Sequence, residues 1–86
     1  MARVALRMFA AAREAAGTGA IELDAETVGE VLAAARARFG PDFAVVLEGS
    51  RVWVDGDEPV AGDATPVTDG AEVAVLPPVS GGADAG

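Results

Sequence analysis

The 86-residue chain is long enough for one small domain, with room for one sheet and a covering helix. Hydrophobic residues make up 51% and charged residues 23%, which is typical of a folded protein and excludes a disordered chain. The formal net charge is −8, and residues 52–86 contain seven acidic side chains and no basic one. These acids would repel nucleic acid, and they either attract a basic protein surface or only keep a small domain in solution.

Most of the side chains that catalyse reactions are missing. The chain contains no Cys, His, Lys or Tyr, which excludes disulfides, zinc sites built on thiolates or imidazoles, imidazole bases and Schiff-base amines. Carboxylates remain, but a domain of this size has little interior in which a carboxyl pKa could be raised for acid-base catalysis. We therefore predict a protein that is not an enzyme, with no catalytic residue, no metal ligand and no permanently bound cofactor.

The amino-terminal residues show no targeting signal. Arg3, Arg7 and Arg13 interrupt the apolar residues there, so neither a signal-peptide core nor a membrane-spanning helix can form. We expect a cytoplasmic protein that does not enter a membrane.

The first half of the chain predicts a hairpin. Val4, Leu6 and Met8 alternate with other residues, which indicates a strand over residues 2–9 with one face on a core. Residues 10–16 favour a single helical turn closed by Gly17, and a second short strand follows around residues 21–23. The two strands are too close in sequence for a parallel crossover, so they should pair antiparallel.

A helix should follow the hairpin. Thr27 and Glu30 form a capping-box pattern at its start, and Gly40-Pro41 ends it. Apolar residues recur at steps of three and four along it, at Val28, Val31, Leu32, Ala35 and Phe39. The next segment, residues 43–47, has helical spacing but is too short for a stable isolated helix, and we expect a turn stabilised by tertiary packing.

The second half predicts a strand from Val52, a turn at Asp55-Gly56, a short return strand over residues 58–60 and a last strand over residues 72–76. Pro77-Pro78 cannot continue a central ladder and should end the sheet. The element order is ββαββ-like, which favours a two-layer α+β fold. A right-handed crossover would place the last strand beside the first, so the remaining tail would leave from the centre of the sheet.

Two segments carry a resemblance to a known family. Residues 69–82, which end in Pro-Pro-Val-Ser-Gly-Gly, resemble the carboxyl-terminal motif of the MoaD/ThiS sulfur carriers, and Phe9-Ala10-Ala11-Ala12-Arg13-Glu14 is similar to the family's opening. The resemblance covers residues 2–82 and favours the molybdopterin synthase small-subunit branch. It implies a ubiquitin-like β-grasp fold, with a mixed sheet of four to five strands covered by one main helix. Residues 1–76 would form this domain and residues 77–86 a flexible tail.

The resemblance also implies the chemistry of the tail. In the family, an E1-like enzyme uses ATP and magnesium to adenylate the terminal glycine carboxylate, here that of Gly82, and sulfur then replaces AMP to give a thiocarboxylate. A free carboxylate is anionic at neutral pH and resists nucleophiles, so activation must come from such a partner. The preceding residues Pro77, Pro78, Val79, Ser80 and Gly81 would thread the tail into partner enzymes. A larger molybdopterin synthase subunit, or another sulfur-accepting enzyme, would supply the catalytic groups.

Apolar positions near the tail suggest a docking surface. Phe9 and Leu76 are out of phase with the inward residues of their strands, and Phe9, Val60 and Leu76 align with positions through which family members contact partners. Trp53 could extend this partner interface. Alternatively, Phe9 packs beneath the alanine-rich turn and Trp53 packs on its neighbours.

One feature departs from the family pattern, because residues 83–86 follow the double glycine. Gly82 as encoded has no free carboxylate, and we expect a protease, plausibly zinc-dependent, to remove the extension. Direct use of Gly86, or a carrier that has lost activation, are alternatives. The acceptor is also open: the carrier could serve thiamin, cysteine, tRNA or another thiolation pathway, or the chain could be a non-covalent β-grasp interaction module.

Overall fold

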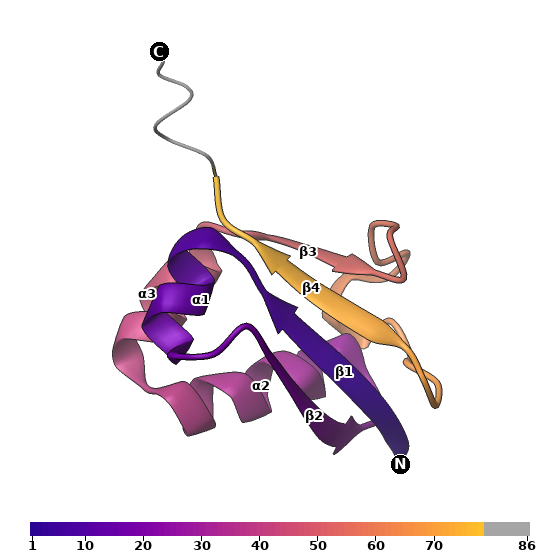
Figure 1. Ribbon diagram of the computed structural model, residues 1–86. Helices are drawn as coiled ribbons and strands as arrows, with labels where there is room; N and C mark the ends of the chain where they lie inside the picture. The colour runs from indigo at the N-terminus through magenta and orange to yellow at the C-terminus, as the bar shows by residue number, and fades with distance from the viewer. Residues whose placement is uncertain (79–86) are drawn as a thin grey trace.

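The computed structural model describes residues 1–78, and within them one sheet carries helices on one face (Figure 1). The elements in chain order are β1 (Ala2–Met8), α1 (Ala10–Ala16), β2 (Ala20–Ala25), α2 (Val28–Phe39), α3 (Pro41–Glu48), β3 (Arg51–Val54), the 3-10 turn η1 (Gly62–Ala64) and β4 (Glu72–Leu76). The sheet order is β2-β1-β4-β3. This arrangement confirms the predicted α+β architecture.

The sheet is mixed, and its last strand lies inside it. β1 and β2 pair antiparallel, with α1 in the connection between them. β4 runs parallel to β1, with Leu6 beside Val73 and Met8 beside Val75. β3 pairs antiparallel with the other side of β4. The predicted crossover is therefore present, and the chain leaves the sheet from an interior strand.

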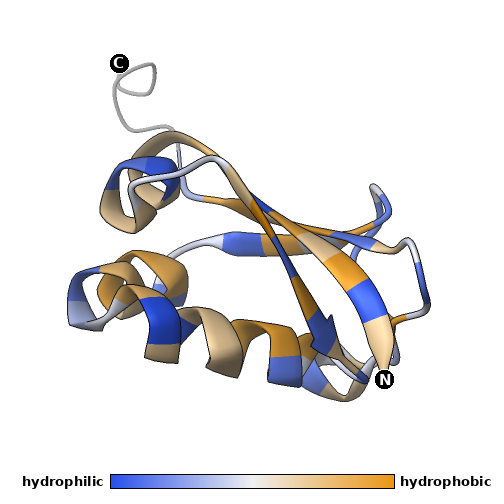
Figure 2. Cartoon of the chain, turned by 60° about the horizontal axis from the view of Figure 1, so that its bottom comes forward, coloured by the Kyte–Doolittle hydropathy of each residue, from blue (hydrophilic) through white to orange (hydrophobic). Residues whose placement is uncertain are grey.

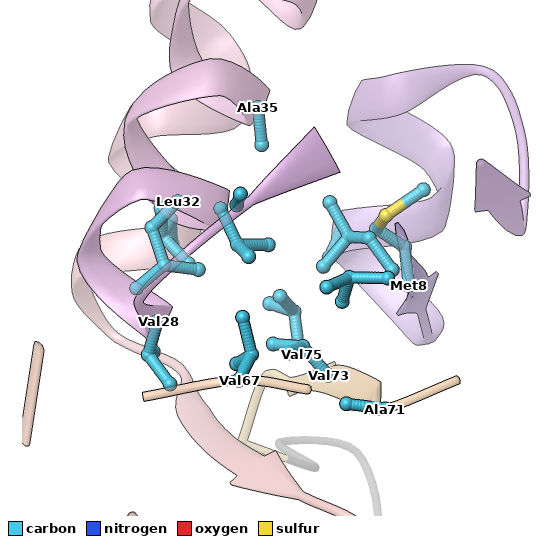
Figure 3. Packing of buried hydrophobic residues seen from close by; sticks show 14 of the residues in the cluster. Met8, Val28, Leu32, Ala35, Val67, Ala71, Val73 and Val75 are labelled. Atoms are coloured by element: carbon cyan, nitrogen blue, oxygen red, sulfur yellow. The ribbon is translucent and has the colours of Figure 1, made fainter. Parts of the chain in front are cut away.

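The core lies between the inner face of the sheet and the helices (Figure 3). Alternate residues along the strands point into it, and Figure 2 shows the polar and apolar residues that alternate along these strands. The stripe of apolar residues on α2 covers this face. The buried side chains include Val4, Leu6, Met8, Val73 and Val75 from the sheet and Val28, Val31, Leu32 and Ala35 from α2.

The start of α2 is capped almost as predicted. The Thr27 hydroxyl accepts a hydrogen bond from the backbone N–H of Glu30 at 3.2 Å. The Glu30 carboxylate reaches back to accept from the N–H of Glu26 at 2.8 Å, one residue further than in the predicted capping box. Both bonds satisfy amide groups that would otherwise lack partners at the start of the helix.

The segment after α2 differs from the prediction. Residues 41–48 form a complete α-helix, α3, with Pro41 in its first turn. Phe43 and Leu47 are buried, and the ring centroids of Phe39 and Phe43 lie 5.1 Å apart. Tertiary packing thus stabilises a helix of a length that would be marginal in isolation. The 12-residue α2 is the main helix of the covering layer; α3 packs beside it, and α1 packs against α3.

The predicted return strand over residues 58–60 is wrong. Asp55 and Gly56 form the predicted turn, with positive φ at both residues, and a single bridge joins Val54 to Asp57. No strand follows that bridge within residues 58–71, and Pro59 has no N–H to donate to one. The first strand also ends one residue early, at Met8, because the chain turns at Ala10, where φ is +50°.

The division into a body of residues 1–76 and a tail of residues 77–86 stays a prediction, because residues 79–86 lie outside the described part. None of the helices within residues 1–78 has the length and apolar character needed to span a bilayer.

Gly29, in the first turn of α2, makes room for η1. A Cβ built on Gly29 would lie 3.0 Å from Asp63 Cβ and 3.1 Å from the Asp63 carbonyl oxygen. Substitution by alanine inside a helix usually stabilises it, by about 1 kcal/mol. Here we expect Gly29→Ala to lower the free energy of unfolding instead, by about 1–3 kcal/mol, because the backbone of η1 must move away. Urea unfolding measures this difference.

Gly49→Ala is the matched control, because a Cβ there would meet no atom closer than 4.0 Å and φ at Gly49 is −93°. We expect it to leave stability unchanged or slightly raised. Equal effects of the two substitutions would show that η1 does not pack closely on α2.

Candidate functional site

β4 ends at Leu76, at the end of the sheet where β1 also ends and β3 begins (Figure 1). The register places Arg51, the first residue of β3, opposite Leu76. On the other side, the Phe9 N–H donates to the Val75 carbonyl oxygen at 3.2 Å. Residues that are far apart in sequence therefore meet where the chain leaves the sheet.

Three of the predicted interface residues lie at this end of the sheet or next to it. Phe9 keeps 39% of its surface exposed, whereas Trp53 and Leu76 are half-buried. A hollow is lined by Gly49, Arg51, Trp53, Leu76, Pro77 and Pro78. We use the name exit surface for Phe9, Trp53, Leu76 and Pro78, whereas Pro77 is buried. The exposure of Phe9 shows that it is not wholly packed beneath α1, and its contact role stays a prediction.

Two arginines flank the exit surface and were not predicted. The Arg7 guanidinium lies 5.7 Å from the centroid of the Phe9 ring and donates to Glu72 Oε2 at 3.1 Å. Arg51 donates to Glu58 Oε2 at 3.5 Å. The signal for Arg7 was present in the sequence, because it lies two residues before Phe9 on a strand and so shares its face. Its stacking on Phe9 restricts the exposed ring.

The remaining predicted residues lie elsewhere. Val60 is 93% exposed but belongs to the connection after β3 and does not line the hollow. Its contact role stays a prediction. Val79, Ser80, Gly81 and Gly82 lie outside the described residues. Within residues 1–78, no three acidic side chains gather closely enough to hold a metal ion.

A comparison with models of protein families identifies the family of this chain. The ThiS family model matches residues 6–82, which is most of the chain and includes the double glycine. The chain belongs to the ThiS family. Solved structures of small archaeal modifier proteins are similar to this chain and confirm the predicted β-grasp fold. A comparison with curated proteins gives no match.

Two similar structures come from archaea. The small archaeal modifier protein 1 from Methanosarcina acetivorans is 29% identical, with 93% of this chain and 96% of that chain covered and a TM-score of 0.84. The Haloferax volcanii HVO 2177 protein is 35% identical, with 93% and 86% covered and a TM-score of 0.75.

A third similar structure is bacterial. It is the complex of subunits 1 and 2 of the molybdopterin-converting factor from Helicobacter pylori, at 21% identity, with 90% of this chain and 95% of that chain covered and a TM-score of 0.69. This likeness supports the fold of the ThiS family member described here.

Leu76 and Leu6 allow one test of which face of the sheet is free, because the same substitution can be made on each face. We expect Leu6→Ala, in the core, to lower the free energy of unfolding by about 2–5 kcal/mol. Leu76→Ala removes a half-buried side chain from the exit surface and should cost less than about 1 kcal/mol. Urea unfolding of both variants makes the comparison. Equal losses would assign Leu76 to the core and argue against a docking role.

Proposed function

We propose that this protein is a sulfur carrier whose Gly82 carboxylate is adenylated and converted to a thiocarboxylate, and that it acts in the cytoplasm in molybdopterin biosynthesis. The main observation in support is the exit of the chain from an interior strand beside an exposed apolar surface. A tail that leaves there can enter the active site of a partner while the exit surface docks on the same partner.

Partner enzymes carry out the chemistry, and this chain contributes the carboxylate of Gly82. The Gly82 carboxylate attacks the α-phosphate of ATP on an E1-like enzyme, pyrophosphate leaves, and an acyl-adenylate forms, with magnesium held by that enzyme. Sulfide, as HS⁻, then attacks the acyl carbon, AMP leaves with the carbon–oxygen bond electrons, and the thiocarboxylate remains. Glycine at the last two positions suits this step, because the absence of a Cβ lets the backbone approach the nucleotide closely. The chain itself has no Cys, His or Lys that could carry out these steps.

The partner interface follows from the same end of the sheet. Phe9, Trp53 and Leu76 present apolar surface, and aromatic residues are enriched among those that contribute most to protein interfaces. In the Helicobacter pylori complex, subunit 1 of the molybdopterin-converting factor is bound to subunit 2. We propose an analogous larger subunit as the sulfur acceptor here. The six acids of residues 52–82 favour a basic surface on that partner.

The extension after Gly82 must be removed before activation in this scheme. A protease, plausibly zinc-dependent, would hydrolyse the bond between Gly82 and Ala83 and so expose the carboxylate. Small residues on the far side of this bond, Ala83 and Ala85, leave it open to attack.

A second candidate function is supported by the similarity to small archaeal modifier protein 1. The same acyl-adenylate could react with an amine of another protein, so that an amide forms and AMP leaves. This modifier function shares activation with the carrier function and differs only in the nucleophile. Protein conjugates that resist both heat and thiol treatment would favour it.

The first test compares chains ending at Gly82 and at Gly86. With the cognate activating enzyme, ATP and a sulfur donor, we expect only the shorter chain to gain the mass of an oxygen-to-sulfur exchange, because only that chain has a free Gly82 carboxylate. Intact-mass spectrometry measures it. A chain of residues 1–82 with Gly82→Val is the control and should remain unmodified. Thiocarboxylation of the full chain at Gly86 would contradict the processing step.

The second test concerns docking. We expect Leu76→Ala and Trp53→Ala to raise the KM for the carrier in adenylation about tenfold, with kcat nearly unchanged, because they remove binding that precedes the chemistry. Pyrophosphate release measures both constants. Val45→Ala is the control, since Val45 is 71% exposed on α3 and lies outside the exit surface. Equal KM values for all variants would rule out docking through this surface.

A further inference from the structure

The sheet has an open edge at β2. In the part of the chain that the structure describes, β2 pairs only with β1 and is the outermost strand. The Met8 N–H donates to the Gly19 carbonyl oxygen at 2.9 Å, which fixes the alternation of this ladder. Ile21 and Leu23 therefore exchange backbone hydrogen bonds with β1. The N–H and C=O groups of Glu22 and Asp24 point outward, past the open edge of the sheet.

The open run has clear limits. At one end, the Ala20 N–H lies 3.5 Å from the Thr18 hydroxyl, which closes the hairpin side. At the other end, the Glu26 carbonyl oxygen accepts from the Val67 N–H at 3.0 Å. Between them, neither Glu22 nor Asp24 has a backbone hydrogen bond to a side chain or loop of residues 1–78. Residues 20–24 thus offer two complete donor and acceptor pairs to an extended segment.

The other edge is not equivalent. β3 has only four residues, and the chain turns back beside it at Asp55-Gly56. Val54 exchanges both of its backbone hydrogen bonds with Asp57, at 2.7 and 3.0 Å. Only Val52 keeps outward backbone groups on that strand. A short strand with a turn folded against it is a common way to protect an edge, and β2 lacks this protection.

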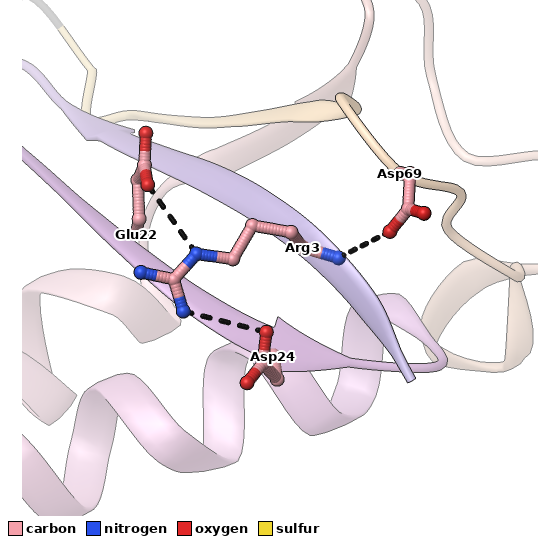
Figure 4. Close-up of polar contacts among 4 residues, drawn as sticks. All are labelled: Arg3, Glu22, Asp24 and Asp69. Atoms are coloured by element: carbon pink, nitrogen blue, oxygen red, sulfur yellow. Dashed lines mark hydrogen bonds and ion pairs between the residues drawn. The ribbon is translucent and has the colours of Figure 1, made fainter.

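The side chains of β2 determine which segment could bind. Ile21 and Leu23 pack against the core but stay half-exposed, because no further strand covers them. On the outer face, Glu22 and Asp24 are exposed (Figure 4). Arg3 donates to both, at 3.3 and 3.4 Å, and these two carboxylates raise its pKa, the hydrogen bond with Asp24 contributing most.

Arg3 does not neutralise both Glu22 and Asp24, so the outer face along the β2 edge stays acidic. It is one cation for two carboxylates, and it reaches them from β1, on the side away from the edge. The side toward the edge therefore carries net negative charge. Opposite charges in directly facing positions stabilise a strand pair, and like charges destabilise it.

We propose that the β2 edge binds an extended basic segment of a partner protein by strand addition. Its alternate residues would be apolar, extending the half-covered row of Ile21 and Leu23, and the residues between them would be Lys or Arg, facing Glu22 and Asp24. This interaction lies on a different strand from the exit surface and does not depend on the sulfur-carrier function.

A second copy of this chain fits the edge poorly. If two open runs overlapped fully and antiparallel, Glu22 would face Glu22 and Asp24 would face Ala20 of the other copy. No basic residue lies within residues 20–24 to compensate. The acidic row thus opposes self-association and admits a basic strand.

The test uses a capped heptapeptide of alternating valine and lysine and the 15N-labelled full chain. We expect saturable shifts of the backbone amide signals, largest at Glu22 and Asp24, because these N–H groups gain acceptors. Replacing the lysines by glutamates should weaken binding at least about tenfold. Added salt should lower the affinity of the lysine peptide, because it screens the opposite charges. A peptide with proline at its centre should also bind at least about tenfold more weakly, because proline lacks the N–H that pairs with the edge.

A pair of variants tests the backbone contribution. Glu22→Pro removes an N–H that has no partner in the described chain, and proline is tolerated at sheet edges. We expect it to weaken peptide binding at least about tenfold, whereas Glu22→Ala, which keeps the N–H, should weaken it only about threefold. The amide spectrum of each variant shows whether it is folded. The proline peptide gives the same information on the unchanged protein if Glu22→Pro unfolds.

Several results would overturn the proposal. Absence of shifts at millimolar peptide would exclude strand addition at this edge. Shifts centred on Trp53 and Leu76 would show that the peptide binds the exit surface. Shifts at β2 that appear on raising the protein concentration alone would identify a second copy as the occupant. Equal binding of the lysine and glutamate peptides would contradict the basic character of the partner.

Discussion

The parallel pairing of β4 with β1 is the constraint on which the rest of the structure depends. It brings Val73 and Val75 beside Leu6 and Met8, in the middle of the core. Parallel neighbours need a long crossover, and here the intervening chain contains α2 and α3, which cover one face of the sheet. No helix within residues 1–78 covers the other face, and the chain ends its last strand in the interior of the sheet. The position of the core, the uncovered face and the point where the chain leaves the sheet all follow from the pairing of β4 with β1.

The two faces of the sheet have different tasks. The inner face holds the apolar residues that the helices cover, and a change there affects folding. The outer face is mostly charged, with Arg3 and Arg7 from β1 paired to acids on the neighbouring strands. Only near the exit point is that face apolar, and there Arg7 lies against Phe9. A partner can thus recognise one end of the sheet without disturbing the core.

Membership of the ThiS family agrees with the absence of Cys, His and Lys from the sequence. A body without Cys, His or Lys offers few nucleophiles or bases of its own, and the proposed function assigns the chemistry at Gly82 to partner enzymes. In the proposed function, binding energy gained at the exit surface would position the residues that follow Pro78. The open edge of β2 lies on the opposite side of β1 from β4. A partner bound there would leave the exit surface accessible.

Sequence patterns alone predict the alternation of the strands, the capped start of α2, the turn at Asp55-Gly56 and the end of the sheet before Pro77-Pro78. These features depend on backbone geometry and on neighbours within four residues. Tertiary structure decided the others: the helix α3, formed because Phe43 and Leu47 are buried, the absence of a strand over residues 58–60, and, within residues 1–78, the unpaired edge of β2. Burial and strand pairing join residues that are distant in sequence, and local periodicity carries no information about them.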